Sequence, residues 1–115
     1  MLPQPPDSAT PQEIPPGTLE MLILRSLAAQ PMHGYGIAQH IERLSGDVFR
    51  VEKGSLYPAL DRVLRSGWAT ATWGTSGTGR RARYYHITPA GRRQLGEKRA
   101  NFLEAFSAIQ RILEG

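Results

Sequence analysis

Arginines in the second half of the chain carry the clearest chemical signal in this sequence. No acidic residue lies between Asp61 and Glu97, and that interval holds half of the basic residues of the chain. They are Arg62, Arg65, Arg80, Arg81, Arg83, Arg92 and Arg93. An unopposed positive field attracts polyanions, and the planar guanidinium forms bidentate hydrogen bonds with phosphate or guanine. A solvated basic surface is the alternative, but the use of arginine alone favours a nucleic acid as the partner.

The composition limits the other classes of protein that need considering. The chain has 115 residues, a formal charge of +4 and no cysteine. It is long enough for one small domain, which a partner chain would help to stabilise. Without cysteine, disulfide scaffolds, thiolate zinc sites and cysteine nucleophiles are excluded, and a reducing cytoplasm fits.

No constellation of residues predicts an enzyme, a metal or a cofactor. Gly74 and Gly79 have the spacing of a phosphate loop, but Arg80 and Arg81 follow where such a loop needs Lys and then Ser or Thr. The three histidines lack both the usual ligand spacings and a nearby carboxylate cluster. No nucleophile, base and orienting group can be named. We therefore expect a binding protein.

We also expect a cytoplasmic protein with no membrane segment. The longest apolar run, Met21 to Leu24, is far shorter than the roughly 20 residues that span a bilayer. The first residues lack the basic and apolar regions of a signal peptide. Residues 1–16 hold six of the nine prolines and almost no apolar side chains, so we expect a disordered arm there.

Apolar spacing predicts three helices in the first half of the chain. The first begins after Thr18 as N-cap and ends before Pro31, and the second ends at Ser45-Gly46. The apolar positions of the second helix are Ile37, Ala38, Ile41 and Leu44. Residues 49–51 alternate like a short strand. In the third helix, Pro58 requires a start close upstream or a kink.

The third helix is expected to bury one face and expose a basic one. Its apolar face is Leu56, Leu60, Val63 and Leu64. Its exposed face is Ser55, Pro58, Ala59, Arg62 and Arg65. Strand-forming residues then recur over 68–73 and 83–88, joined by a flexible turn at 74–79, which predicts a hairpin with arginines on its shoulder.

Thr88-Pro89 predicts the start of a final helix that runs to residue 114. Such a helix is on the order of 39 Å long, longer than so small a body can cover. We expect its apolar stripe to form a dimer interface through Leu95, Phe102, Phe106, Ile109 and Leu113. Trp68, Trp73, Phe102 and Phe106 are interpreted as core and interface aromatics; the alternative is a dimer cavity that binds a flat hydrophobic effector.

The order of these elements predicts a mainly α protein with a small β-hairpin, namely a winged helix-turn-helix followed by a long dimerisation helix. We expect residues 1–16 to be the arm, 17–88 the DNA-binding domain and 89–115 the dimerisation helix. The same elements contain the motifs Pro31-Met-His-Gly-Tyr-Gly-Ile37, Gly54-Ser-Leu-Tyr-Pro-Ala-Leu60, Gly67, Gly79-Arg80 and Arg83-Tyr-Tyr-x-Ile-Thr-x-x-Gly91. In these motifs the chain resembles the PadR family of bacterial transcriptional regulators.

This resemblance implies a homodimeric regulator of the subfamily with a single C-terminal helix. It implies repression from an inverted-repeat operator in double-stranded DNA and release by a small molecule. The chain departs from the family pattern at Leu64, Arg65 and Ser66, where acidic residues are usual, at Trp68, where Leu is usual, and at Arg81, where Pro is usual. These departures strengthen the positive field.

The sequence and the resemblance together predict the contacts with DNA. The expected residues are Lys53, Ser55, Tyr57, Pro58, Arg62, Arg65, Arg80, Arg81 and Arg83. Ser55, Tyr57 and Pro58 come from the third helix, and Gly79, Arg80 and Arg83 from the wing. A winged-helix adaptor that binds a protein is the alternative, which the acid-free arginine segment disfavours.

Overall fold

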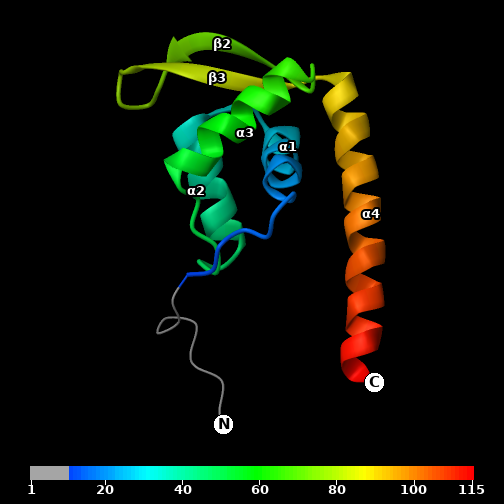
Figure 1. The fold of residues 1–115 in the computed structure, drawn as a ribbon. Coiled ribbons are helices and arrows are strands. Elements are labelled where there is room, and N and C mark those ends of the chain that lie inside the picture. The colour runs from blue at the N-terminus through cyan, green and yellow to red at the C-terminus, as the bar shows by residue number, and fades with distance from the viewer. Residues whose placement is uncertain (1–10) are drawn as a thin grey trace.

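The computed structural model describes residues 11–115, which form four helices and a three-stranded antiparallel sheet (Figure 1). In chain order the elements are α1 (Leu19–Ala29), β1 (Met32–His33), α2 (Gly34–Leu44), α3 (Lys53–Arg65), β2 (Ala69–Thr75), β3 (Arg81–Ile87) and α4 (Pro89–Glu114). This confirms the predicted fold class, a winged helix-turn-helix followed by one long helix.

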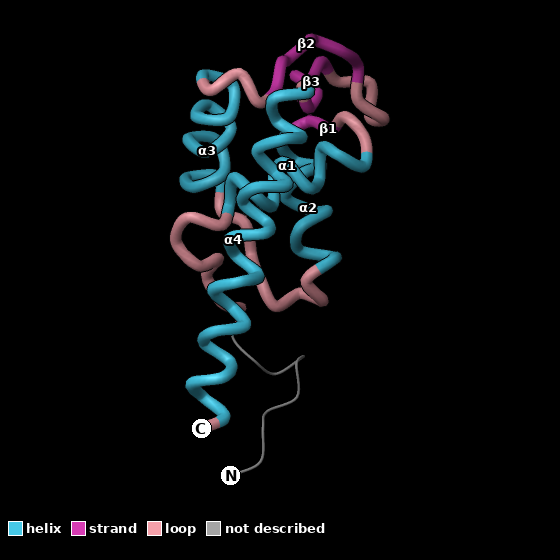
Figure 2. Tube along the Cα trace, turned by 90° about the vertical axis from the view of Figure 1, so that its right-hand side faces the viewer, coloured by secondary structure: helices cyan, strands magenta, loops and turns pink. Residues whose placement is uncertain are grey.

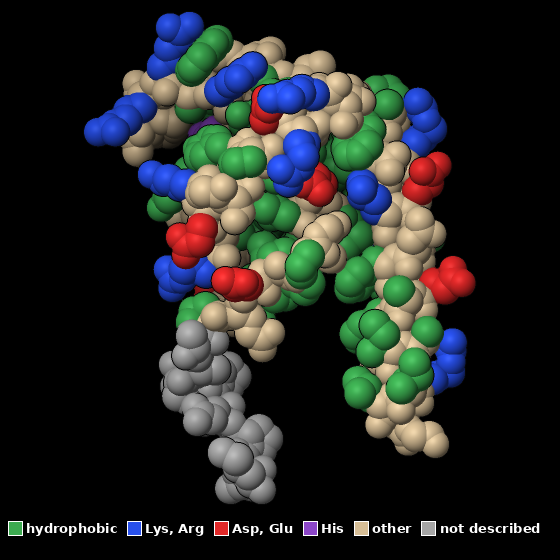
Figure 3. All heavy atoms as spheres, in the orientation of Figure 1, with side chains coloured by type: hydrophobic (Ala, Val, Ile, Leu, Met, Phe, Trp, Pro, Cys, Tyr) green, Lys and Arg blue, Asp and Glu red, His purple; other side chains and the backbone are tan. Residues whose placement is uncertain are grey.

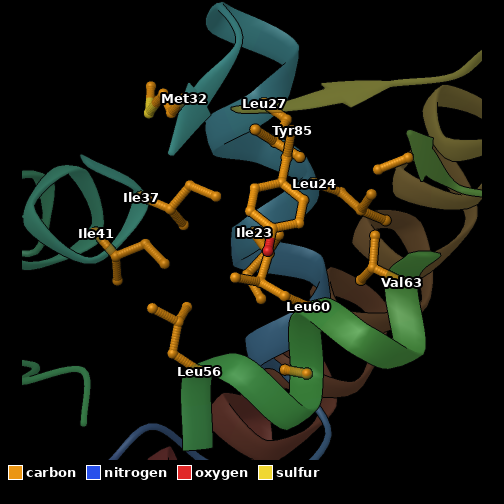
Figure 4. Close-up of a cluster of buried hydrophobic side chains, with 12 residues drawn as sticks. Ile23, Leu24, Leu27, Met32, Ile37, Ile41, Leu56, Leu60, Val63 and Tyr85 are labelled. Carbon is orange, nitrogen blue, oxygen red and sulfur yellow. The ribbon is translucent and has the colours of Figure 1, made fainter. Parts of the chain in front are cut away.

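The core forms where α1 packs against α2, α3 and β3 (Figure 4). The spacing of the apolar residues along each helix explains why they are buried, because residues three and four apart share one face of a helix. The buried apolar side chains of α1 are Ile23, Leu24 and Leu27, and those that α3 adds are Leu56, Ala59, Leu60 and Val63. Ala59 was expected on the exposed face. That prediction was wrong, because position 59 follows Leu56 by three residues and lies on the same face.

The second helix also differs from its prediction at one end. Leu44 was assigned to the buried face of α2, but its side chain is 67% exposed. The last turn of α2 extends past the core, while Ile37 and Ile41 are buried as expected. The helix closes at Ser45, and Gly46 adopts the left-handed conformation (φ +64°) that the predicted C-cap requires.

The strand predicted at residues 49–51 does not form. The amide of Phe49 donates to Ser45 Oγ (3.1 Å) and that of Val51 to Glu42 Oε2 (2.8 Å), so side chains satisfy this backbone; Phe49 makes only an isolated bridge with Gln12. The strand β1 lies earlier in the chain. Met32, expected in a turn, pairs with Tyr85 of β3, so that the sheet has the order β1-β3-β2.

The hairpin is longer than predicted, and its turn is shorter. β2 reaches Thr75 and β3 begins at Arg81, with register pairs from Ala69↔Ile87 to Thr75↔Arg81. Pro58 lies inside α3, which begins at Lys53, so the carbonyl that Pro58 leaves without a donor belongs to the first turn. The expected start close upstream is therefore confirmed.

Helix α4 begins at Pro89 as predicted, and Thr88 Oγ1 caps it by accepting from the amide of Gly91 (3.0 Å). Thr18 is the N-cap residue of α1, but its hydroxyl donates to the Pro15 carbonyl (2.7 Å) instead of capping the helix. The first turns of α4 lie beside α1, and the rest runs past the body of the domain (Figures 1 and 2). The radius of gyration, 15.9 Å, accordingly exceeds the roughly 13 Å of a compact chain of this length.

The expected arm falls mostly outside the described residues, since positions 1–10 are not among them. In residues 11–16, the amide of Gln12 donates to the Val48 carbonyl (2.7 Å), and Ile14 packs against the core. Across residues 11–115, no helix is long and apolar enough to cross a membrane.

Candidate nucleic-acid interface

A broad groove of about 1030 Å³ lies between the hairpin and the first turns of α2 and α3. The hairpin contributes Trp73, the turn residues Ser76, Gly77, Thr78 and Arg80, and then Arg81, Ala82, Arg83 and Tyr85. The helical side contributes His33, Gly34, Tyr35, Gln39 and Tyr57. The groove therefore combines arginines with aromatic rings and separates the wing from the helix-turn-helix.

The wing arginines are exposed and face this groove. Alternate residues of a strand share one face, so Arg81 and Arg83 lie on the same face of β3 as the buried Tyr85. The guanidinium of Arg81 lies 4.6 Å from the centroid of the Trp73 ring, and Trp73 is the register partner of Arg83. Within residues 11–115, no carboxylate forms a salt bridge with Arg80, Arg81 or Arg83. Basic side chains gather on this part of the surface (Figure 3).

The two arginines predicted on α3 have a different environment. Arg62 Nε donates to Glu20 Oε1 of α1 (2.9 Å), and Arg65 forms a salt bridge with Asp61 one turn earlier. The positive charge of the segment between Asp61 and Glu97 is therefore partly neutralised in the fold, because Glu20 of α1 and Asp61 pair with two of its arginines. Arg62 and Arg65 remain predicted DNA contacts, but their field is weaker than the sequence indicates.

The predicted residues at the start of α3 are all exposed, but they do not share one hollow. Tyr57 lines the groove beside the wing. Ser55 and Arg62 border a second hollow of about 270 Å³, next to Glu13 of the N-terminal segment, and Lys53 borders a third beside Tyr57. Pro58 is exposed and lines none of these three hollows. The structure thus brings Tyr57 together with Arg80, Arg81 and Arg83.

Close packing fixes the angle between α2 and α3 at this site. A Cβ added to Gly34 would lie 2.8 Å from the Tyr57 hydroxyl oxygen and 3.1 Å from ring carbons of Tyr57. The tyrosine ring therefore lies directly on the first turn of α2. Gly34 and Tyr57 both belong to the motifs on which the family resemblance rests, and this contact is a physical reason for both residue types.

His33 links the first turn of α2 to the base of the wing. Its Nδ1 accepts from the amide of Gly36 (2.9 Å), which makes the ring an N-cap. The same ring meets Tyr84 edge-on, with centroids 5.3 Å apart. Tyr84 in turn covers Gly74, where a Cβ would lie 3.0 Å from its ring, and donates to the Thr75 carbonyl (3.3 Å). Tyr84 thereby connects the first turn of α2 with the end of β2 that lies next to the hairpin turn.

Several groove residues were missed or misassigned by the sequence. Trp73 was interpreted as a core or interface aromatic, but its side chain is 61% exposed. The alternation that buries Ala69 does predict an inward face for Trp73, but the hairpin extends beyond the core at that point. His33, Tyr35 and Gln39 were not predicted as site residues, although His33 and Tyr35 belong to a motif of the resemblance.

Two titratable side chains among the described residues have a pKa displaced from its ordinary value. Within residues 11–115 no group of three or more His, Asp or Glu side chains could hold a metal ion. His40 Nδ1 lies 3.0 Å from Ser26 Oγ, and burial together with the charges of Arg43 and Arg25 lowers the pKa of His40. Burial raises the pKa of Tyr85. His40 is thus paired with Ser26, and Tyr85 packs in the hydrophobic core.

The apolar stripe of α4 divides into two parts. Leu95 packs against the core of its own chain. Beyond it, the apolar side chains are exposed, on the half of α4 that leaves the body, where the space-filling view shows apolar side chains facing open space (Figure 3). They are Phe102, Leu103, Phe106, Ile109, Ile112 and Leu113. Phe102 and Phe106 stack on each other with centroids 6.1 Å apart.

Comparisons with known proteins point to one family. A family model described as the transcriptional regulator PadR-like family matches residues 23–97. The chain is 33% identical over 88 residues to the transcriptional regulator Rv3488 of Mycobacterium tuberculosis, covering 76% of this chain and 78% of that protein. A solved PadR-like transcriptional regulator from Bacillus cereus is 28% identical, with a TM-score of 0.73 and coverage of 86% and 94%.

A second solved structure resembles the chain in its fold. A transcriptional regulator from Clostridium thermocellum has a TM-score of 0.75 and covers 83% of this chain and 92% of that one. Its sequence identity is 24%, so this likeness concerns the fold alone.

Proposed function

Because the chain belongs to the PadR-like family of transcriptional regulators, we propose that it acts by binding operator DNA as a homodimer. The family and its relatives are regulators of transcription and not enzymes. In this proposal residues 17–88 bind DNA and residues 89–115 form the dimer. The carrying observation is the groove in which the wing arginines, without a salt bridge to any carboxylate of residues 11–115, face the first turns of the helix-turn-helix.

Helix α3 is the proposed recognition helix. In winged helix-turn-helix proteins this helix enters the major groove with its N-terminal residues, and the wing contacts the neighbouring backbone. Ser55, Tyr57 and Pro58 are exposed in the first half of α3, and Lys53 is its first residue. The groove beside Tyr57 is then the place for a phosphodiester strand, which Arg80, Arg81 and Arg83 would neutralise.

The second half of α4 is the proposed dimer interface. Ile112 and Leu113 are 77% and 79% exposed, and Phe102 and Phe106 lie on the same stripe. A monomer rarely exposes so continuous an apolar surface, and a two-fold dimer would bury it against the same stripe of a second copy. Two recognition helices roughly 34 Å apart would match one turn of DNA, which calls for an inverted-repeat operator.

We propose that the protein represses transcription, since a dimer bound to an operator near a promoter blocks access to that promoter. The stacked pair of Phe102 and Phe106 would lie inside the dimer, where a flat hydrophobic or aromatic effector could displace it. Such an effector would act by favouring a dimer whose recognition helices no longer match the operator.

Binding-site selection from random duplex DNA tests the proposal. The expected result is an enriched inverted repeat with half-sites whose centres lie about one helical turn apart. Enrichment of a single unrepeated half-site would contradict the dimeric mode, and no enrichment above the input pool would contradict sequence-specific recognition. A Phe106→Asp variant in the same selection should lose the repeat, because it removes the proposed interface.

A further inference from the structure

We propose that Trp73 is a positioning residue for Arg81: its indole ring holds the guanidinium in place on the inner face of the wing, ready for a DNA phosphate. This inference rests on the proposed DNA binding and adds the reason for an exposed tryptophan in the wing. It concerns two positions whose side chains the structure brings together, with the guanidinium carbon 4.6 Å from the ring centroid.

The exposure of Trp73 indicates a role other than core packing. The side chain is 61% exposed, whereas Ala69 and Tyr85 on the same face of the hairpin are buried. An exposed indole ring makes a large unfavourable contact with water. Its contacts in the groove are with basic residues, because Arg81 covers the ring and Arg83 is its register partner.

The molecule orders its arginines in two different ways. On α3, Arg62 and Arg65 are held by Glu20 and Asp61, and each carboxylate cancels the charge it orders. On the wing, Arg81 is held by an aromatic ring, which attracts the cation through its quadrupole and carries no net charge. Only the second arrangement leaves a full positive charge for a polyanion.

Ordering the side chain in advance should strengthen binding. A free arginine loses rotamer freedom when it is fixed on a phosphate, and a side chain already held in place loses less. A dimer has two such wings, so this saving in side-chain entropy applies to two arginines. We therefore expect Trp73→Leu to weaken binding to duplex DNA roughly tenfold, while Trp73→Phe, which keeps an aromatic face, recovers most of the affinity.

A double-mutant cycle tests this assignment. The probe is a fluorescein-labelled 30-base-pair duplex of mixed sequence, and anisotropy gives the affinity of the wild type, Trp73→Leu, Arg81→Gln and the double variant at several salt concentrations. Arg81→Gln removes one phosphate contact per protomer, so the slope of log K against log salt should become less negative by about 2. In the Arg81→Gln background, Trp73→Leu should cause no further loss of affinity.

The outcomes separate this inference from the proposed function. A tenfold loss from Trp73→Leu that persists in the Arg81→Gln background would mean that Trp73 acts on DNA by itself, which overturns the positioning role. A wild type that does not bind the duplex overturns the proposed function, and the positioning role with it. In the free protein, ring current should shift the Arg81 δ-methylene protons upfield, and unshifted protons would overturn the stack independently of DNA.

Discussion

The α-carbon of Gly91 lies directly against the carbonyl oxygen of Trp68, so closely that a Cβ at position 91 would be 2.0 Å from that oxygen. The same carbonyl accepts from the amide of Thr88 (3.0 Å), and Thr88 Oγ1 donates to the Gly67 carbonyl (2.7 Å). The first turn of α4 is thereby joined to the end of α3. The direction of the proposed dimer helix is fixed relative to α3, the proposed recognition helix.

Replacing Gly91 by Ala should therefore destabilise the protein by about 3 kcal/mol, because the close neighbour is backbone and cannot rotate away. The matched control is Gly96→Ala in the same helix, where nothing lies within 4 Å of the added Cβ. That variant should gain about 0.5–1 kcal/mol from helix propensity. Urea unfolding measures both, and equal effects of the two substitutions would refute the packing argument.

Stability should fall in mild acid because of His40. The folded protein holds the pKa of His40 below its ordinary value of 6.5, through burial and then through Arg43 and Arg25. The unfolded chain therefore binds more protons in this range, and the free energy of unfolding decreases as the pH falls through 6.5, levelling off below the folded pKa. Thermal unfolding at pH 8 and pH 5.5 measures this loss of stability, which should be smaller for His40→Gln than for the wild type. An NMR titration placing the folded pKa at or above 6.5 would contradict this.

The fold could be predicted from sequence where local signals and burial agree. The Thr88-Pro89 start of α4, the hairpin and the Ser45-Gly46 cap each follow from nearby residues. The strand β1 was missed because its partner is distant in the chain: it forms where Met32 meets Tyr85. The strand expected at residues 49–51 was wrong for a nearer reason, because Ser45 and Glu42 accept hydrogen bonds from the amides of Phe49 and Val51.

The candidate site shows the same division. The wing arginines could be found from the absence of acidic residues around them, a property of the sequence itself. The partner of Arg62 could not, because Glu20 lies 42 residues away in the chain and meets it only when α1 packs on α3. The exposure of Trp73 likewise depends on how far the hairpin outruns the core, which no local pattern records.

The wing and the recognition helix should contribute differently to DNA binding. Arg80→Ala should weaken binding to all sequences to a similar extent, since we expect this residue of the hairpin turn to contact the DNA backbone. Ser55→Ala and Tyr57→Phe should change which bases are selected, because both side chains lie in the first half of α3. Site selection with each variant measures the difference. A changed base preference in Arg80→Ala, together with an unchanged one in the α3 variants, would reverse the assignment.

A charge in the apolar stripe should prevent dimerisation. In the proposed dimer, Phe106→Asp buries an unpaired carboxylate and loses the stacking with Phe102. Together these should cost about 3 kcal/mol of the free energy of dimerisation. The control is Ala100→Asp, an exposed position away from the stripe on the same helix. Sedimentation at micromolar concentration should show a monomer for Phe106→Asp and a dimer for the control. A wild type that sediments as a monomer would disprove the interface.

The salt dependence of binding to duplex DNA tests the central claim most directly. A dimer presents two copies of Arg80, Arg81 and Arg83, which lack salt-bridge partners within residues 11–115. Neutralising six phosphates gives a slope of log K against log salt of about −5. Anisotropy titrations between 50 and 200 mM salt, roughly the range in which counterion release is measured, should give that slope. A slope near zero would contradict DNA binding through the wing.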